Sequence, residues 1–304
     1  MTQTALSNPM PLAHQEVANE GSMLESRMLG RIDLDIADVE NALSVAAVHP
    51  KNQAYSEFSI PVHPMSSGGS WATQMLANFS GNEQDGMSKE YSGSAKWTEL
   101  GNRLPYLKAK VEQLFVPGIV KSVRLFIASP GSMIRAHTDY REFKGGFTRV
   151  HLVLRTTQDC MNSEGASVYH MRQGEVWLLG SRLPHAGGSF GETTRIHLVC
   201  DLDPNVPVSE IFHADADMSA PISPRLINRP KLSEQDLEKL IDGLTISMKT
   251  IGYENIDLIC QMLPFQYAFD TGRTYDVLIE VAKRAGNDAL LKRAIDTRLE
   301  FMGY

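Results

Sequence analysis

The chain has 304 residues and a formal net charge of −7, from 29 basic and 36 acidic residues. An acidic chain is a poor candidate for coating nucleic acids or membranes, because both surfaces are anionic. The sequence has no apolar run of roughly 18 residues that would span a bilayer and no basic-then-apolar signal peptide. Its three cysteines are widely spaced, which favours reduced thiols over a disulfide framework. We therefore expect a cytoplasmic protein without nucleic-acid or membrane partners.

The first part of the chain predicts a tail, a strand and a helix. Residues 1–27 show no periodic apolar pattern and are expected to form a flexible tail. Apolar residues predict a short strand over 28–34. A helix is expected over 36–48 with Asp35 as its N-cap. Residues 61–70 are rich in proline, glycine and serine, which predicts a loop.

The middle of the chain, about 120–203, predicts many short strands. Its segments have β-branched residues and a two-residue period, and glycines separate them at turn-like intervals. This pattern favours a barrel or sandwich over alternating β–α–β units. The expected strands are 123–127, 148–154, 168–171, 176–179 and 195–200.

After about residue 203 the pattern becomes helical. Ser233 and Asp236 have the spacing of a capping box, and apolar residues at helical spacing follow them to residue 244. Further helices are expected over 275–282 and 288–301. The expected divisions are the tail (1–27), a β-rich core (28–225) and a helical C-terminal subdomain (226–304).

Three residues in the strand-rich segment have the spacing of a metal site. His137 and Asp139 are two residues apart, so on an extended chain their side chains project to the same side and can bind one metal ion. His185, on a predicted turn between strands, would supply a third ligand. Two histidines and one carboxylate leave three open positions on an octahedral metal, as in non-haem Fe(II) oxygenases. Because Asp139 is present, no position is left for a halide, which argues against a halogenase.

Basic residues near this triad predict a site for carboxylates. Arg195 follows His185 by ten residues at the start of an apolar strand, and a guanidinium pairs with a carboxylate bidentately. Arg149 and His151 share one face of their strand and can reach a second carboxylate. Each residue also has a plainer interpretation, as a chance motif, a strand-end arginine, a structural ion pair or a core histidine. For His197, the core interpretation is favoured.

Longer segments follow one another in a recognisable order. They are MLGRIDLD, AYSEFS, LPYL, IRAHTDYREF, FTRVHLVL, YHMRQGEVWLLG, LPHAGGSF and RIHLVCDL. With these segments the chain resembles, from residue 28 to residue 304, the L-proline cis-hydroxylase group of the aspartyl/asparaginyl β-hydroxylase family, which are Fe(II)/2-oxoglutarate dioxygenases.

The resemblance implies a mainly β fold with helices, namely a double-stranded β-helix core of the jelly-roll or cupin type and a helical C-terminal subdomain. It implies that His137, Asp139 and His185 bind Fe(II) and that Arg195 binds the distal carboxylate of 2-oxoglutarate. It also implies O2 as a co-substrate, with ascorbate as the reductant in vitro.

The resemblance further implies roles for residues on the neighbouring strands. Arg149 and His151 match the family's Arg-x-His motif, which implies contact with the inner carboxylate of 2-oxoglutarate or with the carboxylate of the substrate. Arg124, on an upstream strand, is expected to lie near the substrate. Trp177 is expected to serve packing.

The implied substrate is a free L-amino acid, proline or a close analogue such as pipecolate. An apparent extra loop over 60–70 departs from the resembled pattern. A lid at the pocket and a surface loop without substrate contact are both compatible with it. Other free amino acids such as lysine, and peptide- or carrier-bound residues, therefore stay open as substrates. A catalytically idle metal- or ligand-binding β-barrel is the alternative from another class, although it would not need all four of the metal and arginine residues.

Overall fold

The computed structural model describes residues 24–51, 59–61, 71–86, 91–139, 146–180 and 182–303. Most of the predicted tail and residues 62–70 of the predicted loop lie outside these ranges. Within them, no helix combines the length and the apolar character needed to cross a bilayer. All three cysteines are buried free thiols, as expected.

The N-terminal elements begin inside the predicted tail. Ser26 is buried, its backbone N–H donates to the Glu164 carboxylate at 3.1 Å, and strand β1 follows at Arg27–Arg31. Helix α1 (Ile36–Ala47) begins after Asp35, whose side chain accepts a hydrogen bond from the backbone N–H of Asp38. The predicted strand and the predicted helix with its cap are therefore confirmed.

Two antiparallel sheets form the core. The seven-stranded sheet has the order β1-β10-β7-β12-β5-β3-β4, and the six-stranded sheet has the order β13-β9-β8-β11-β6-β2. The strands are β2 (Ser59–Pro61), β3 (Trp71–Asn78), β4 (Lys96–Trp97), β5 (Val120–Ala128), β6 (Ser132–His137), β7 (Thr148–Arg155), β8 (Cys160–Glu164), β9 (Ser167–His170), β10 (Glu175–Leu178), β11 (His185–Ser189), β12 (Arg195–Leu202) and β13 (Arg225–Leu226).

The eight strands from β5 to β12 pair in a nested order. β5 pairs with β12, β6 with β11, β7 with β10 and β8 with β9, so the first strand meets the last and the two middle strands form a hairpin. This is the strand arrangement of a jelly roll, or double-stranded β-helix. The predicted fold class is confirmed.

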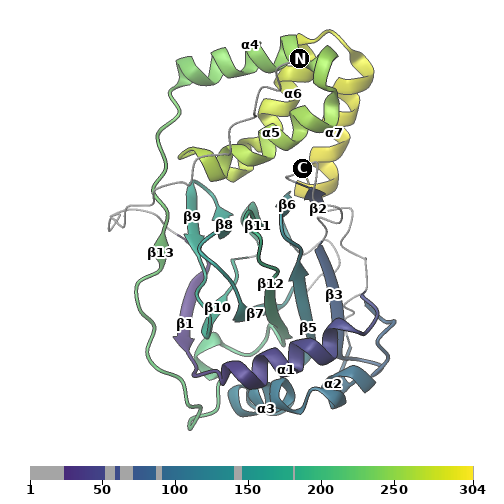
Figure 1. Cartoon of the computed structure of the whole chain (residues 1–304), viewed down its shortest axis with the longest axis vertical. Helices are drawn as coiled ribbons and strands as arrows, with labels where there is room; N and C mark the ends of the chain where they lie inside the picture. The colour runs from purple at the N-terminus through teal and green to yellow at the C-terminus, as the bar shows by residue number, and fades with distance from the viewer. Residues whose placement is uncertain are drawn as a thin grey trace, which may run out of the picture.

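The two faces of the seven-stranded sheet differ in polarity along strand β12. On β12 every residue is buried, but the two faces differ because side chains alternate along a strand. Leu198 and Leu202 pack in a core with Val39 of α1 and Leu107 of α3. Helices α2 (Glu99–Arg103) and α3 (Pro105–Leu114) lie with α1 at one end of Figure 1.

The C-terminal helices gather at the opposite end of the strands (Figure 1). They are α4 (Glu234–Ile251), α5 (Tyr253–Gln266), α6 (Thr274–Arg284) and α7 (Asp288–Met302), with a single-turn helix at Thr271–Arg273. A second single-turn helix, Val208–Glu210, instead contributes Val208 to the core beside α1 and α3. Ser233 caps α4 by accepting the N–H of Asp236, as predicted. Their apolar side chains share a core with Met133 of β6 and Met161 of β8. This helical layer therefore packs on the six-stranded sheet.

One sequence expectation is corrected here. Ile60 and Pro61, expected in a loop, belong to β2, which pairs with β6, and Ile60 is buried.

Candidate active site

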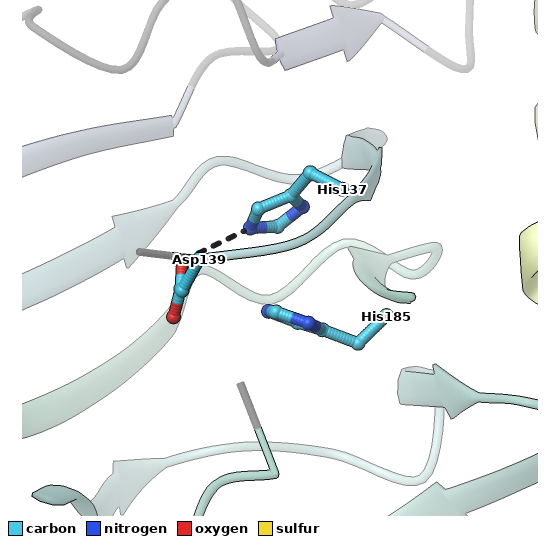
Figure 2. Close-up of side chains that lie close together, drawn as sticks. All are labelled: His137, Asp139 and His185. Atoms are coloured by element: carbon cyan, nitrogen blue, oxygen red, sulfur yellow. Dashed lines mark ion pairs between the residues drawn. The ribbon is translucent and has the colours of Figure 1, made fainter. Parts of the chain in front are cut away.

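The antiparallel pairing of β6 and β11 brings the predicted metal triad together. His137 ends β6 and lies opposite His185, the first residue of β11. Asp139 follows two residues after His137, with 3.6 Å between His137 Nε2 and Asp139 Oδ1. One ligand atom from each of the three residues lies within 4.8 Å of the others. Figure 2 shows the three side chains converging on one point.

Backbone carbonyls orient both imidazoles of the predicted metal triad. His137 Nδ1 lies 2.7 Å from the Arg135 carbonyl, and His185 Nδ1 lies 2.9 Å from the Leu183 carbonyl. Because a carbonyl only accepts, each Nδ1 carries the proton and each Nε2 presents its lone pair to the centre. Burial and the neighbouring His185 lower the pKa of His137 to about 4, so its ring is neutral at pH 7. This donor set fits a divalent metal ion such as Fe(II).

A chain of ion pairs, partly buried at Asp139 and Arg149 and fully buried at Asp201 and Arg124, holds the carboxylate of the triad. Asp139 Oδ2 accepts from Arg149 Nη1 at 2.7 Å, and Arg149 Nε donates to Asp201 Oδ1 at 2.7 Å. Asp201 also accepts from Arg124 Nη2 at 2.6 Å. Although burial raises the pKa of Asp139, the Arg149 guanidinium holds it below its ordinary value. Burial acts in the same way on Asp201, where Arg149 and Arg124 hold the pKa well below the usual range.

A cavity lies beside the triad, between the two sheets. Besides the triad and Arg149, its lining includes Trp71, Phe126, His151, Asn162, Arg195 and His197. The cavity therefore joins the predicted metal ligands to the predicted carboxylate-binding residues.

Arg195 is a buried cation that lacks a carboxylate partner among the described residues. Its Nη2 donates to Asn162 Oδ1 at 2.6 Å, its Nε donates to His197 Nε2 at 3.1 Å, and its guanidinium stacks on Trp71. Its Nη1 has no hydrogen-bond partner within the described residues, and the same holds for Asn162 Nδ2 and His151 Nε2. A buried charge is costly unless an anion pairs with it. The arrangement fits an anionic ligand such as a dicarboxylate.

The contacts of Arg195 also fix the protonation of two histidines. Since Arg195 Nε donates to His197 Nε2, the proton of neutral His197 is on Nδ1. That Nδ1 lies 3.2 Å from His151 Nδ1, which must accept, so neutral His151 carries its proton on Nε2. Burial, then Arg149 and Arg195, lower the pKa of His151 to about 3. His151 therefore presents an N–H donor to the cavity.

The remaining predicted residues differ in whether they line the cavity. Arg149 lines the cavity, whereas Arg124 is fully buried behind it, pairs with Asp201 and lies 5.8 Å from the ring centroid of Phe126. Trp177 is buried and stacks on Tyr169 with 5.2 Å between ring centroids, so it packs, as expected.

Sequence reasoning missed several residues of the site. His197 is buried, as expected, but it also lines the cavity and links Arg195 to His151. Asp201 lies on the same face of β12 as Arg195 and His197. The two-residue period of a strand, counted from Arg195, could therefore have identified both His197 and Asp201 as residues of the site. Asn162 carried no such signal, because only the packing of the two sheets brings it to Arg195.

Comparison with known proteins assigns most of the chain. Residues 37–204 match the family model for aspartyl/asparaginyl β-hydroxylase, and residues 208–302 match that for the C-terminal part of L-proline 3-hydroxylase. An L-proline cis-4-hydroxylase from Rhizobium meliloti (strain 1021) is 30% identical over 281 residues, 92% of this chain and 97% of the relative. An L-proline cis-3-hydroxylase from Streptomyces sp is 30% identical over 287 residues, 89% of this chain and 92% of the relative. The chain therefore belongs to the aspartyl/asparaginyl β-hydroxylase family, which confirms the predicted resemblance and the prediction that the protein is a hydroxylase.

Proposed function

We propose that this protein is an Fe(II)- and 2-oxoglutarate-dependent dioxygenase that hydroxylates an unactivated C–H bond of a free L-amino acid, proline or a close analogue such as pipecolate. One observation carries the proposal: the buried Arg195 lacks a carboxylate partner among the described residues and shares its cavity with the metal triad. The relatives named as L-proline hydroxylases support the substrate class.

In this proposal the protein's residues divide between the metal and 2-oxoglutarate. His137, Asp139 and His185 would hold Fe(II), and Arg195 would bind the distal carboxylate of 2-oxoglutarate. When bound, the iron and 2-oxoglutarate supply the oxidising chemistry, in which O2 is consumed, succinate and CO2 form, and one oxygen atom enters the substrate. A guanidinium suits the distal carboxylate because its donors match both oxygens, and burial strengthens the pairing.

The other polar groups of the cavity would orient the ligands. His151 presents its Nε2–H and would donate to the inner carboxylate of 2-oxoglutarate. Arg149 would bind the substrate carboxylate, while Phe126, which also lines the cavity, would pack against the apolar carbons of the substrate. These contacts place the reacting C–H bond and exclude water from it. The role of Arg124 in this proposal is indirect, because Arg124 is not among the residues that line the cavity and contacts Asp201 and the ring of Phe126 behind it.

The test is succinate formation by the purified protein with Fe(II), ascorbate, O2 and 2-oxoglutarate. Proline, pipecolate, lysine, leucine and arginine are supplied as free L-amino acids, and mass spectrometry detects the gain of one oxygen atom. We expect proline or pipecolate to stimulate succinate formation and to gain one oxygen.

The outcomes separate the alternatives. Hydroxylation of lysine alone would move the substrate to an acyclic amino acid. Binding of 2-oxoglutarate without stimulation by any amino acid of the panel would favour a peptide- or carrier-bound substrate. If neither 2-oxoglutarate nor a divalent metal bound, the dioxygenase proposal would be refuted.

A further inference from the structure

We propose that the C-terminal helical layer, α4 to α7, is a structural part of the metal site. It holds the end of strand β6, which carries His137 and leads into Asp139. Gln261 on α5 and Tyr275 on α6 act as positioning residues, together with the last turn of α7. The inference rests on the proposed function, since it requires His137 and Asp139 to be metal ligands. In Figure 1 the helical layer lies against this end of β6.

The end of β6 has different neighbours on its two sides. β11 pairs with β6 as far as His137. On the other side, β2 pairs with β6 only from Ser132 to Ile134, and none of the strands described continues alongside residues 135–138. Buried backbone N–H and C=O groups need hydrogen-bond partners. At this edge the partners come from the helices.

Side chains of α5 and α6 form hydrogen bonds with both the backbone N–H and the backbone carbonyl of Ala136, the residue before His137. The N–H of Ala136 donates to Gln261 Oε1 at 2.9 Å, and its carbonyl accepts from the Tyr275 hydroxyl at 2.8 Å. Ala136, Gln261 and Tyr275 are each at most 1% exposed. The two contacts therefore fix the peptide units on both sides of Ala136 in a buried environment.

The last turn of α7 holds the residue between the two ligands. The N–H of Thr138 donates to the Phe301 carbonyl at 3.1 Å, and the Thr138 hydroxyl donates to the Met302 carbonyl at 3.2 Å. Both carbonyls lie at the C-terminal end of the helix, where they have no acceptor role within it. Positions on both sides of His137 are thus tied to the helical layer.

A second series of contacts links α5 to the His137 imidazole through Arg135. Gln261 Nε2 donates to Asp257 Oδ1 at 3.3 Å, one turn earlier on α5, and Asp257 forms an ion pair with Arg135. The Arg135 carbonyl in turn accepts the Nδ1–H of His137 at 2.7 Å. A buried amide and a buried carboxylate cost stability unless they are fully bonded. Here both contact the same strand end.

Metal affinity depends on how firmly the ligands are held. A site needs its ligands within about 0.5 Å of the productive geometry, and groups behind the ligands provide that precision. Releasing Ala136 would let the end of β6 move and would separate His137 and Asp139 from His185 on β11. We therefore expect weaker metal binding without loss of the fold.

The test is a titration of the metal-free, full-length protein with Co(II). Calorimetry measures the affinity, and visible absorption reports the coordination of the bound ion. The double variant Gln261→Met with Tyr275→Phe removes both contacts to Ala136 and should bind Co(II) about tenfold more weakly, with an altered visible spectrum. Tyr253→Phe is the matched control. It removes a hydroxyl from another buried tyrosine of the same layer, whose contact at 3.5 Å is with Thr297 inside the layer. Its Co(II) affinity and spectrum should equal those of the wild type.

The outcomes distinguish this inference from the proposed function. Equal Co(II) affinity and spectra for wild type and double variant would overturn the inference and leave the proposed function standing. Absence of Co(II) binding by the wild type would overturn both. If circular dichroism shows that the double variant does not fold, Tyr275→Phe alone is titrated; it should bind about threefold more weakly, and unchanged affinity would overturn the inference.

Discussion

Replacing Asp201 with asparagine tests the ion-pair chain behind the metal triad. Asp201 is fully buried and bonds Arg149 at 2.7 Å and Arg124 at 2.6 Å. With Asp139, these four residues carry two positive and two negative charges. The substitution leaves two positive charges against one negative charge at nearly the same volume.

The expected loss follows from the burial of the cluster. Removing one partner of a buried ion pair costs about 3–5 kcal/mol, because the remaining charge has lost its counter-charge. Asparagine keeps one oxygen that can accept a hydrogen bond, so we expect the lower end, about 3 kcal/mol of unfolding free energy. The assay is urea unfolding at pH 7. Glu254→Gln, which breaks an exposed pair with Arg293, is the control and should cost less than about 1 kcal/mol.

The pH dependence gives a second check on Asp201. Its folded-state pKa lies well below the ordinary value of about 3.9. A lowered carboxylate pKa stabilises the fold above the unfolded-state pKa, and this stabilisation is lost as the pH falls towards the folded-state pKa. The difference between wild type and Asp201→Asn should therefore be constant from about pH 5 to 8 and shrink below about pH 4. A loss below about 1 kcal/mol at pH 7, or a difference that does not shrink in acid, would refute the reasoning.

Three further substitutions probe the cavity. Arg195→Met should weaken 2-oxoglutarate binding about 100-fold in calorimetry, because two charge-assisted hydrogen bonds of about 1.5 kcal/mol each are lost. The ligand-free variant should melt no lower than the wild type, since a buried cation is removed, and a lower melting temperature would contradict that account. Gly187→Ala places a Cβ 2.9 Å from Arg195 Nη1 and should therefore displace the guanidinium. We expect a severalfold higher KM for 2-oxoglutarate and an unchanged Co(II) affinity. An unchanged KM would show that the guanidinium can move aside without weakening 2-oxoglutarate binding. Asp139→Ala should abolish turnover and weaken Co(II) binding while circular dichroism stays native, and retained turnover would remove Asp139 from the metal site.

The sequence predicted elements whose polar and apolar residues lie on different faces, and it missed elements that mix the two kinds of residue on each face. Strand β12 and helix α1 show clear periods, because each has two different faces. Strand β3 carries apolar and polar residues on both faces, with Thr73 and Gln74 among its apolar side chains, so its sequence does not alternate. Helix α5 buries residues around most of its circumference, among them Asp257 and Gln261, so no apolar stripe marks it.

Some residues of the site could likewise be predicted from the sequence, and others could not. His137 and Asp139 are close in sequence, and the expected partner His185 lies opposite them because of strand pairing. Gln261 is 125 residues from Ala136, and only the docking of the helical layer on β6 brings the two together. Local spacing cannot report such a contact.

The nested strand order also bears on how the chain folds. The hairpin of β8 and β9 is local, and each further pair, β7 with β10, β6 with β11 and β5 with β12, closes around the pair already formed. Zippering outwards in this order closes only short additional loops at each step, which keeps the entropic cost of each closure small. His137 and His185 meet in the third of these four closures. Under the proposed function, a metal ion would find its ligands only late in this order, and it would stabilise the finished fold by mass action instead of directing the early steps.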